Sequence, residues 1–389
     1  MKNVGILLPI IGKGGAERVA TRLSTLLCDD YNLFFIVFSQ DYEPTYPYKG
    51  TFINLGVSPS KSKIKKFFSI LKRSRKLRKI KKKYKLDCVI SFLDSANLVN
   101  VLSKTKKCKT IISIRNFDFL NLGFLHKKVT QYVYKKSNTI VCCSREIEKA
   151  IKKNYKVKNS LVTIYNPFDY ESINRQANEL LDISLPKGFK FVTMGRIMRQ
   201  KGYWNLVKSF YLFLKNNPNA DAYLIIIGKD YSEGKINELV KSLKIESKVY
   251  FLGQLDNPFN VLKHCDCYIL SSLFEGFPNA LTEAMCCGIP IISSNCKSGP
   301  KEILNQSTEL EINDVYLAKY GVLYKEYTES LVEDYSTYIA NEHQYLTQAM
   351  ELVFENETIR KEYSEKAIER IKDFSYSRCK QSFIDVIDK

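Results

Sequence analysis

Histidine is scarce in this sequence, and its cysteines follow no paired pattern. There are only 3 histidines, and the 11 cysteines form no C-x-x-C motif. Structural zinc sites usually combine closely spaced Cys and His ligands, so a zinc protein is not expected. Scattered cysteines are instead typical of a reduced, cytosolic chain.

Long hydrophobic runs are also missing. No stretch approaches the roughly 18 apolar residues that suggest a membrane-spanning helix. The first residues, MKNVGILLPIIGKGG, hold a short apolar run that Pro9 interrupts, and no small-residue cleavage site follows. This pattern predicts a first strand and a loop rather than a signal peptide.

Positive charge is abundant and unevenly placed. The 389 residues are 45% hydrophobic, which excludes general disorder, and they carry a net charge of +19. Residues 1–185 hold 35 Lys and Arg against 14 Asp and Glu, whereas the rest of the chain holds 25 against 27. A polyanionic partner or surface is therefore expected for the first half.

Short apolar segments alternate with helical patterns along the chain. Because these segments lack polar alternation, we expect strands that are buried on both faces of parallel sheets. The pattern restarts after a linker at 178–188, which predicts an α/β protein with two Rossmann-like, doubly wound domains at 1–185 and 186–373. The expected strands are Val4–Leu8, Leu33–Phe38, Cys88–Phe92, Thr110–Ser113, Thr139–Cys142, Val162–Tyr165, Phe191–Gly195, Tyr223–Gly228, Val249–Leu252, Cys267–Leu270 and Ile289–Ser293.

Two further segments complete the predicted organisation. Residues 374–389 are expected to form an amphipathic helix that packs back on the first domain, and 326–347 are expected to be helical without an assigned role. In doubly wound domains, ligands bind at the carboxyl ends of the strands. The cleft between the two domains is therefore the expected site.

Two carboxylates stand eight positions apart in the stretch EGFPNALTE. Glu275 is expected on a loop, and Glu283 about one turn inside a helix that starts near Asn279. The N–H groups at a helix start have no partner within the helix and carry partial positive charge. Beside two acids, such a start suits a ligand with phosphate and hydroxyl groups. A capped helix with ordinary surface glutamates is the alternative.

Glycines or cations follow the first strand of each domain. Gly14 and Gly15 would let the backbone approach a ligand at the start of the first helix, although they do not complete a G-x-G-x-x-G motif and a plain loop is the alternative. Arg196 and Lys201 lie five positions apart and could neutralise a diphosphate. Two solvated surface cations are the alternative there.

A strongly basic segment, Lys61–Lys85, holds 14 basic residues in 25 and no acid. Four of its apolar residues fall on one helical face: Ile64, Phe67, Phe68 and Leu71. Such a helix lies on an anionic membrane or binds nucleic acid, and nucleic acid is disfavoured because aromatics do not interleave with the charges. The alternative is a helix whose apolar face packs on the sheet and whose basic face is solvated. The two interpretations are compatible, because the apolar face can pack on the core while the basic face meets lipid. The basic residues expected to meet lipid are Lys65, Lys66, Lys72, Arg73, Arg75, Lys76 and Lys79.

Polar residues follow two other strands of the first domain. Asp94, Arg115 and Asn116 are expected to reach the cleft, unless Asp94 and Asn116 cap the segments that follow them. The histidines occupy helical contexts away from strand ends and are expected to be structural or exposed; they are His126, His264 and His343.

Several motifs occur in a characteristic order. The first half contains GGAER at Gly14–Arg18, VCCS at Val141–Ser144 and YNPFD at Tyr165–Asp169, and the second contains GRIMRQKG at Gly195–Gly202, EGFPNALTE, and SGPKEIL at Ser298–Leu304. Together they resemble the retaining glycosyltransferases of family 4, which have the GT-B fold. The resemblance covers nearly the whole chain.

The resemblance implies sugar transfer from a nucleotide-sugar donor, with retention at the anomeric carbon and without a required metal or other cofactor. Arg196 and Lys201 would bind the donor diphosphate and stabilise its developing charge. Glu283 would hold the ribose hydroxyls, and Glu275 would contact the donor sugar. Glu275 could also act as a covalent nucleophile, which is the less favoured role. Backbone N–H groups of Phe277, Asn279 and Ala280 would meet sugar or phosphate, and Gly14 and Gly15 would approach the donor from the other domain.

One position departs from the family pattern. Many relatives carry a histidine after the fourth strand of the first domain, where it hydrogen-bonds to the donor sugar. Arg115 stands near that place here, in SIRN. We expect Arg115 or Asn116 to read a sugar hydroxyl instead.

The sequence thus predicts a cytoplasmic enzyme, peripheral on the inner face of the cytoplasmic membrane. It would add a hexose or N-acetylhexosamine, from a UDP-sugar, to a lipid-linked saccharide in surface-polysaccharide assembly. One alternative is a nonhydrolysing nucleotide-sugar epimerase of the same fold. The other is a non-catalytic scaffold that binds membrane or nucleic acid, which the combination of acids and cations disfavours.

Overall fold

The computed structural model describes residues 1–389 except 13, 42, 45, 61, 118–122 and 328–332. Lys13 of the glycine-rich loop, Lys61 of the basic segment and part of 326–347 therefore lie outside the described residues. The chain forms two compact units, which we call unit 1 (1–167 with 376–389) and unit 2 (168–375).

Unit 2 starts upstream of the predicted boundary near residue 185. Helix α6 (Tyr170–Ala177) belongs to it because α6 packs on α9 (Phe259–Lys263). The Asn257 side chain adds a hydrogen bond of 2.8 Å from Nδ2 to the carbonyl of Gln176. The last helix, α14 (Tyr376–Asp388), belongs to unit 1.

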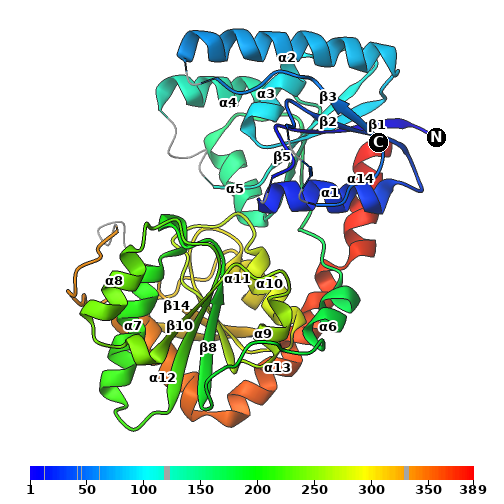
Figure 1. Ribbon diagram of the computed structural model, residues 1–389. Helices are drawn as coiled ribbons and strands as arrows, with labels where there is room; N and C mark the ends of the chain where they lie inside the picture. The colour runs from blue at the N-terminus through cyan, green and yellow to red at the C-terminus, as the bar shows by residue number, and fades with distance from the viewer. Residues whose placement is uncertain (13, 42, 45, 61, 118–122, 328–332) are drawn as a thin grey trace. The chain divides into compact units, whose positions relative to one another are not determined.

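Unit 1 contains a seven-stranded sheet in the order β3-β2-β1-β4-β5-β6-β7, in which every pairing is parallel. One core lies between the sheet and helices α1 and α14, where α14 buries Cys379 and Phe383. A second core lies under α2 and α3, so helices cover both faces (Figure 1). The elements are β1 (Asn3–Leu8), α1 (Gly15–Leu27), β2 (Asn32–Val37), β3 (Thr51–Asn54), α2 (Lys63–Lys83), β4 (Cys88–Phe92), α3 (Asp94–Leu102), β5 (Lys109–Ile114), α4 (Phe124–Lys136), β6 (Thr139–Cys142), α5 (Arg145–Asn154) and β7 (Ser160–Thr163).

Unit 2 repeats this arrangement with the order β10-β9-β8-β11-β12-β14-β13, and only β13 runs antiparallel to its neighbour. Its main core joins the sheet to α7, α8 and α12, with Trp204 and Phe210 fully enclosed. The remaining elements are β8 (Phe189–Met194), α7 (Tyr203–Asn216), β9 (Ala222–Ile227), α8 (Lys235–Ser242), β10 (Val249–Gly253), β11 (Cys267–Leu270), α10 (Asn279–Cys286), β12 (Ile291–Ser294), α11 (Pro300–Asn305), β13 (Val315–Ala318), β14 (Gly321–Tyr324), α12 (His343–Glu355) and α13 (Glu357–Ile371).

The predicted α/β class with two Rossmann-like units is confirmed, and every predicted strand is present. The prediction of a helix over 326–347 is wrong for the described residues 333–342, because α12 begins only at His343. Three strands escaped prediction, namely β3, β13 and β14. The first of these, β3, is an edge strand with little buried surface, so it lacks the continuous apolar run of a central strand.

Candidate functional site

Two loops meet at the carboxyl ends of the neighbouring strands β8 and β11. Gly202 is the residue before α7 and has a φ of 60°, and a Cβ there would lie 2.4 Å from the carbonyl oxygen of Ser271. Only glycine permits both this backbone conformation and this close approach. Hydrogen bonds from Ser271 Oγ to the Lys201 carbonyl (2.8 Å) and from the Leu273 N–H to the Gln200 carbonyl (2.8 Å) join the loops.

This junction brings Lys201 onto Glu275. The Lys201 ammonium lies 2.6 Å from Glu275 Oε1, and the Glu275 residue is only 6% exposed. Ser272 Oγ donates to the same oxygen at 2.7 Å, and Gln200 Nε2 donates to Oε2 at 3.4 Å. The carboxylate is therefore held in a polar setting that compensates for its burial.

Two buried tyrosines form hydrogen bonds with the end of β8, near this ion pair. The Tyr203 hydroxyl donates to the Gly195 carbonyl at 3.0 Å, and the Tyr268 hydroxyl donates to the Met194 carbonyl at 3.3 Å. Burial raises the pKa of both hydroxyls, and the nearby negative charge of Glu275 adds to the effect. Both groups therefore remain neutral donors that fix the end of β8.

The second acid, Glu283, lies in the fifth position of α10 and is buried. The start of this helix follows Pro278, whose side chain offers no acceptor to cap the first N–H groups. Residues after β12 support the turn, since a Cβ on Gly299 would lie 2.7 Å from Pro278 Cδ. The Ser298 N–H also donates to the Glu275 carbonyl at 3.0 Å. The EGFPN and SGPKE segments thus form one packed structure.

The other predicted residues of unit 2 differ in their exposure. Arg196 is exposed at the end of β8 and forms no ion pair with a described carboxylate. Asn279 and Ala280 are partly exposed at the start of α10. The ring of Phe277 is buried between Phe168 and Phe374, at centroid distances of 6.2 and 5.3 Å. Any ligand contact by Phe277 would therefore come from its backbone.

Four residues of the unit 2 site escaped prediction: Gln200, Tyr203, Tyr268 and Ser272. Their roles depend on contacts between loops that are about 70 residues apart in the chain, as in the Gln200–Glu275 hydrogen bond. The GRIMRQKG and SSLFEGF stretches contain Gln200 and Ser272, whereas Tyr203 and Tyr268 lie just outside them. Only the adjacency of β8 and β11 brings these residues together.

The predicted residues of unit 1 occupy separate loops of that unit. Arg115 follows β5 and donates from Nε to Ser113 Oγ at 2.7 Å, from Nη1 to Asn166 Oδ1, and lies 5.0 Å from the centre of the Phe92 ring. Burial lowers the pKa of its guanidinium. Asn116 is partly exposed beside it.

The two glycines of unit 1 lie at the start of α1. Gly14 is the residue before the helix and Gly15 opens it. A Cβ on Gly14 would lie 2.1 Å from Glu17 Oε2, so any side chain there would displace the Glu17 carboxylate. Asp94, predicted to reach a ligand or to cap, is the first residue of α3.

Helix α2 differs from its predicted orientation. Its apolar residues Ile64, Phe67 and Phe68 are exposed, whereas Arg73 is buried. The Arg73 guanidinium donates twice to the carbonyl of Val57, at 2.9 and 3.1 Å, and Lys76 donates to the carbonyl of Leu55. Arg73, which was predicted to meet lipid, is buried instead and anchors α2 to the chain that follows β3. Lys76 adds a hydrogen bond there but is partly exposed, so its contact with lipid stays a prediction. The other basic residues predicted to meet lipid are exposed: Lys65, Lys66, Lys72, Arg75 and Lys79.

Neither a metal cluster nor a spanning helix occurs in the described part of the chain. No group of three or more His, Cys, Asp and Glu residues there could hold a metal ion. Its helices are also too short or too polar to cross a bilayer. The described cysteines are all free thiols.

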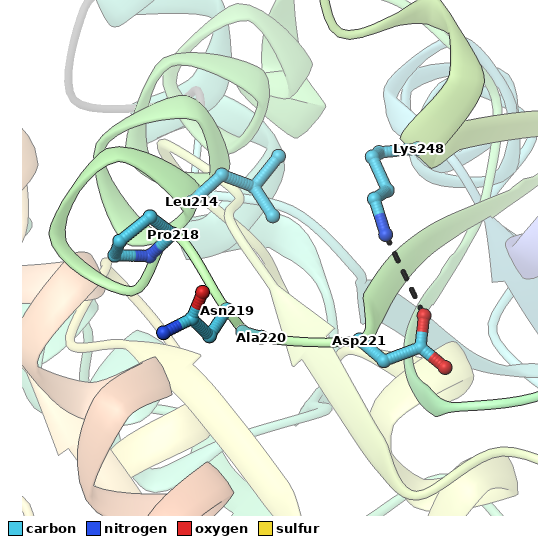
Figure 2. Close-up of a pocket in the computed structure, with 6 residues that line it drawn as sticks. All are labelled: Leu214, Pro218, Asn219, Ala220, Asp221 and Lys248. Carbon is cyan, nitrogen blue, oxygen red and sulfur yellow. Dashed lines mark ion pairs between the residues drawn. The ribbon is translucent and has the colours of Figure 1, made fainter.

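A cavity of about 380 Å³ lies elsewhere in unit 2 (Figure 2). Its lining includes Asp221 and Lys248, whose charged groups lie 3.5 Å apart. Both residues immediately precede strands, β9 and β10. The cavity is thus at the amino ends of the strands, opposite the edge where Lys201 and Glu275 meet.

A pair of doubly wound units in one chain defines the GT-B class of fold. Solved structures agree: the Anabaena protein HepE in complex with UDP superposes with a TM-score of 0.72, at 15% identity, over 100% of both chains. At this identity the likeness shows the fold alone.

Sequence comparisons then give the family. Residues 184–370 match the model of glycosyl transferases group 1, and residues 13–172 match that of glycosyltransferase family 4. An uncharacterized glycosyltransferase of Methanocaldococcus jannaschii is 35% identical over 80% of this chain and 81% of its own length. The chain belongs to glycosyltransferase family 4, as its motifs predicted, and is a glycosyltransferase.

A relative with a named reaction matches over most of its length. It is the N-acetylgalactosamine-N,N'-diacetylbacillosaminyl-diphospho-undecaprenol 4-alpha-N-acetylgalactosaminyltransferase of Campylobacter jejuni. This enzyme is 25% identical and aligns over 96% of both chains.

Proposed function

We propose that this glycosyltransferase moves a hexose or N-acetylhexosamine from a UDP-sugar to a lipid-linked saccharide, with retention at the anomeric carbon and without a metal. The observation that carries the proposal is the Lys201–Glu275 ion pair, at 2.6 Å, in which Glu275 is buried and Lys201 is partly buried, close to the start of α10. A cation, a carboxylate and a helix start together suit a ligand that has both phosphate and hydroxyl groups.

Different residues of unit 2 would bind different parts of the nucleotide-sugar donor. Lys201 and Arg196 would neutralise the diphosphate, and a lysine ammonium has three donors, so it can bind Glu275 and a phosphate oxygen together. The N–H groups of Asn279 and Ala280 would meet the same anion. Glu283 would hold the ribose hydroxyls and Glu275 a hydroxyl of the sugar.

These groups supply what departure of the diphosphate requires. Negative charge grows on the leaving oxygen, and fixed cations with helix N–H groups stabilise it without reorganisation. The departing phosphate itself would deprotonate the acceptor on the same face. Glu275 is held by three donors, which favours a binding role over a nucleophilic one.

The acceptor and the place of action follow from relatives and from unit 1. The Campylobacter jejuni relative acts on a diphospho-undecaprenol saccharide, which supports a lipid-linked acceptor in surface-polysaccharide synthesis. Unit 1 carries most of the excess positive charge of the chain. We place the enzyme on the inner face of the cytoplasmic membrane, where anionic lipid attracts basic proteins.

Exposed apolar side chains in unit 1 support this location. Two helices provide them, α2 and α4, and both pack on α3 (Figure 1). Lysines flank each group, including Lys65 and Lys66 on α2 and Lys127 and Lys128 on α4, all exposed. The combination is typical of a surface that enters the headgroup region. The apolar residues are Ile64, Phe67, Phe68, Phe124, Leu125, Val129 and Tyr132, each at least 43% exposed.

The reaction is tested with a panel of UDP-, GDP- and ADP-sugars and a diphospho-polyprenol saccharide. Thermal shift selects the donor, since a ligand at 100 times its Kd stabilises by about 2.7 kcal/mol. We expect free UDP and a glycosylated acceptor, and NMR of the product should show the anomeric configuration of the donor. Isomerised donor without acceptor consumption would indicate the epimerase instead.

The site is tested by Glu275→Ala and Lys201→Ala. Each variant should abolish transfer and donor hydrolysis while circular dichroism shows a folded protein. Full activity in both variants would refute the proposed site. Flotation with anionic liposomes, with RNA as a competitor, tests the location: binding to RNA but not to lipid would refute it.

A further inference from the structure

Three side chains from two loops hold the carboxylate of Glu275. Oε1 accepts hydrogen bonds from Lys201 at 2.6 Å and from Ser272 at 2.7 Å, and Oε2 accepts one from Gln200 at 3.4 Å. Lys201 has a proposed role at the diphosphate. Ser272 and Gln200 have no assigned role, although both touch the same acid.

Both side chains are themselves fixed by backbone contacts. Gln200 Nε2 also donates to the Phe274 carbonyl at 2.9 Å, and the Gln200 carbonyl accepts from the Leu273 N–H at 2.8 Å. The carbonyl of Ser272 accepts from Ser294 Oγ at 2.7 Å, and Ser272 is 1% exposed. Contacts at the ends of β11 and β12 therefore hold the backbone of Ser272 and the side chain of Gln200 in place.

The hydrogen bonds to Glu275 divide unequally between its two carboxylate oxygens. A carboxylate has about four acceptor positions, two on each oxygen. Within the described residues, two donors occupy Oε1 and one occupies Oε2. Oε2 therefore accepts fewer hydrogen bonds from the described residues than Oε1 does.

We propose that Ser272 and Gln200 are positioning residues that aim Glu275 Oε2 at one hydroxyl group of the donor sugar. The inference rests on the proposed function, because it assigns Glu275 to a sugar. When Lys201 shares its ammonium with a phosphate, Ser272 and Gln200 keep the carboxylate in place. The two residues thereby determine which sugars bind, while the nucleotide depends on other groups.

The test compares the affinities of UDP and a UDP-sugar, measured by calorimetry. The probes are UDP and whichever of UDP-glucose, UDP-galactose and their 2-acetamido forms binds the wild type best. In Ser272→Ala and Gln200→Met, the Kd for UDP should stay within about twofold. The Kd for the UDP-sugar should rise about tenfold, the usual cost of one hydrogen bond to a charged group.

A double-mutant cycle separates positioning from mere support of the fold. In a Glu275→Ala background the sugar contact is already lost, so adding Ser272→Ala should change the Kd for the UDP-sugar by less than twofold. Ser272→Thr, which keeps the hydroxyl, should recover most of the affinity. Ser293→Ala is the matched control, because Ser293 is equally buried and its hydroxyl donates only to the Ser294 carbonyl.

Three outcomes would overturn the proposal. They are equal losses of affinity for UDP and UDP-sugar, an undiminished effect of Ser272→Ala in the Glu275→Ala background, and unchanged UDP-sugar affinity in both single variants. If Ser272→Ala does not fold, Gln200→Met carries the same test. Failure of the proposed function gives a different result: a wild type that binds neither UDP nor any UDP-sugar would refute the donor class, and isomerised UDP-sugar without transfer to the acceptor would indicate the epimerase.

Discussion

Units 1 and 2 share the order of their first five strands but differ in the charged groups at the carboxyl ends of their strands. In unit 2, the loop cation Lys201 contacts a carboxylate, Glu275, at 2.6 Å. In unit 1, the loop cation Arg115 contacts neutral groups, Ser113 and Asn166, and no described carboxylate pairs with it. The same scaffold therefore supports a compensated charge in one unit and an uncompensated one in the other.

The difference indicates separate tasks. A paired cation and acid offer both a donor and an acceptor, which suits a ligand that combines phosphate with hydroxyl groups. A partly buried cation without an acid is costly, and desolvation accordingly lowers the pKa of Arg115. An electron-rich ligand group would offset this cost. Unit 1 also carries most of the surplus positive charge of the chain, consistent with an anionic surface or partner there.

The largest expected effect comes from removing the unit 2 cation without changing its bulk. Lys201→Met should lower kcat by about 10²- to 10³-fold, because one fixed group that stabilises developing charge is lost. Steady-state kinetics with the selected UDP-sugar measures this loss. A decrease below tenfold would contradict the role of Lys201 at the diphosphate.

Lys208→Met is the matched control for that experiment. Lys208 is a buried lysine of unit 2 that, like Lys201, has an acid partner, in this case Asp334 at 2.7 Å. It lies in the body of α7, away from the loop ends. The variant should lose stability, because a partner charge is left alone, but should keep its Kd for UDP.

The next expected effect is on the stability of unit 2 at acidic pH. Burial, with a contribution from Lys208, lowers the pKa of His343 from 6.5 to about 4. Between these values the unfolded chain binds a proton and the folded chain does not, so stability falls as the pH decreases from 6.5 towards 4. Over the whole window the loss is about 3 kcal/mol. Trp204, the single tryptophan, reports unfolding of unit 2 by fluorescence.

His343→Gln should flatten this dependence in urea titrations between pH 5 and pH 7.5. Gln can still donate to Asn205 Oδ1, which accepts from the His343 ring at 3.1 Å. His126→Gln is the control, because His126 is exposed on α4 of unit 1. Equal slopes in the His343 variant and the wild type would show that another group carries the acid sensitivity.

The fold was largely predictable because buried parallel strands are recognisable in the sequence as apolar runs. β4, β6 and β11 have the predicted bounds. The edge strands β3 and β13 were not predicted, since edge strands need not be apolar on both faces. The buried strand β14, which pairs with both β12 and β13, was also missed. Family membership was also predictable, because it depends on the order of short motifs.

Contacts between distant loops were not predictable from spacing. Glu275 and Lys201 were each identified, but their ion pair and the donors Gln200 and Ser272 depend on the adjacency of β8 and β11. Buried cations were also missed. Arg73 was assigned to the lipid-facing side because charged residues are usually exposed, yet it donates to a backbone carbonyl in the interior.

A smaller effect is expected at the uncompensated cation of unit 1. Arg115→Gln should lower kcat/KM by about 10- to 100-fold, the range for one hydrogen bond to a charged group. Arg115→Lys should recover part of the activity, since it keeps the charge without the planar fork. Arg145→Gln removes an exposed cation at the start of α5 and should be neutral. Wild-type kinetics in Arg115→Gln would make Arg115 a structural residue only.

The smallest effect distinguishes the two faces of α2 within unit 1. Arg75 is exposed, and Arg75→Gln should reduce binding to anionic vesicles about fivefold, which corresponds to about 1 kcal/mol for one basic residue near lipid. Arg73 is buried, with its guanidinium 4.4 Å from the centre of the Phe38 ring and bonded to the Val57 carbonyl. Arg73→Gln should therefore leave vesicle binding unchanged and lower the free energy of unfolding by about 1.5 kcal/mol. Vesicle sedimentation and urea unfolding of both variants test this division, and loss of vesicle binding in Arg73→Gln alone would reverse the assignment of the two faces.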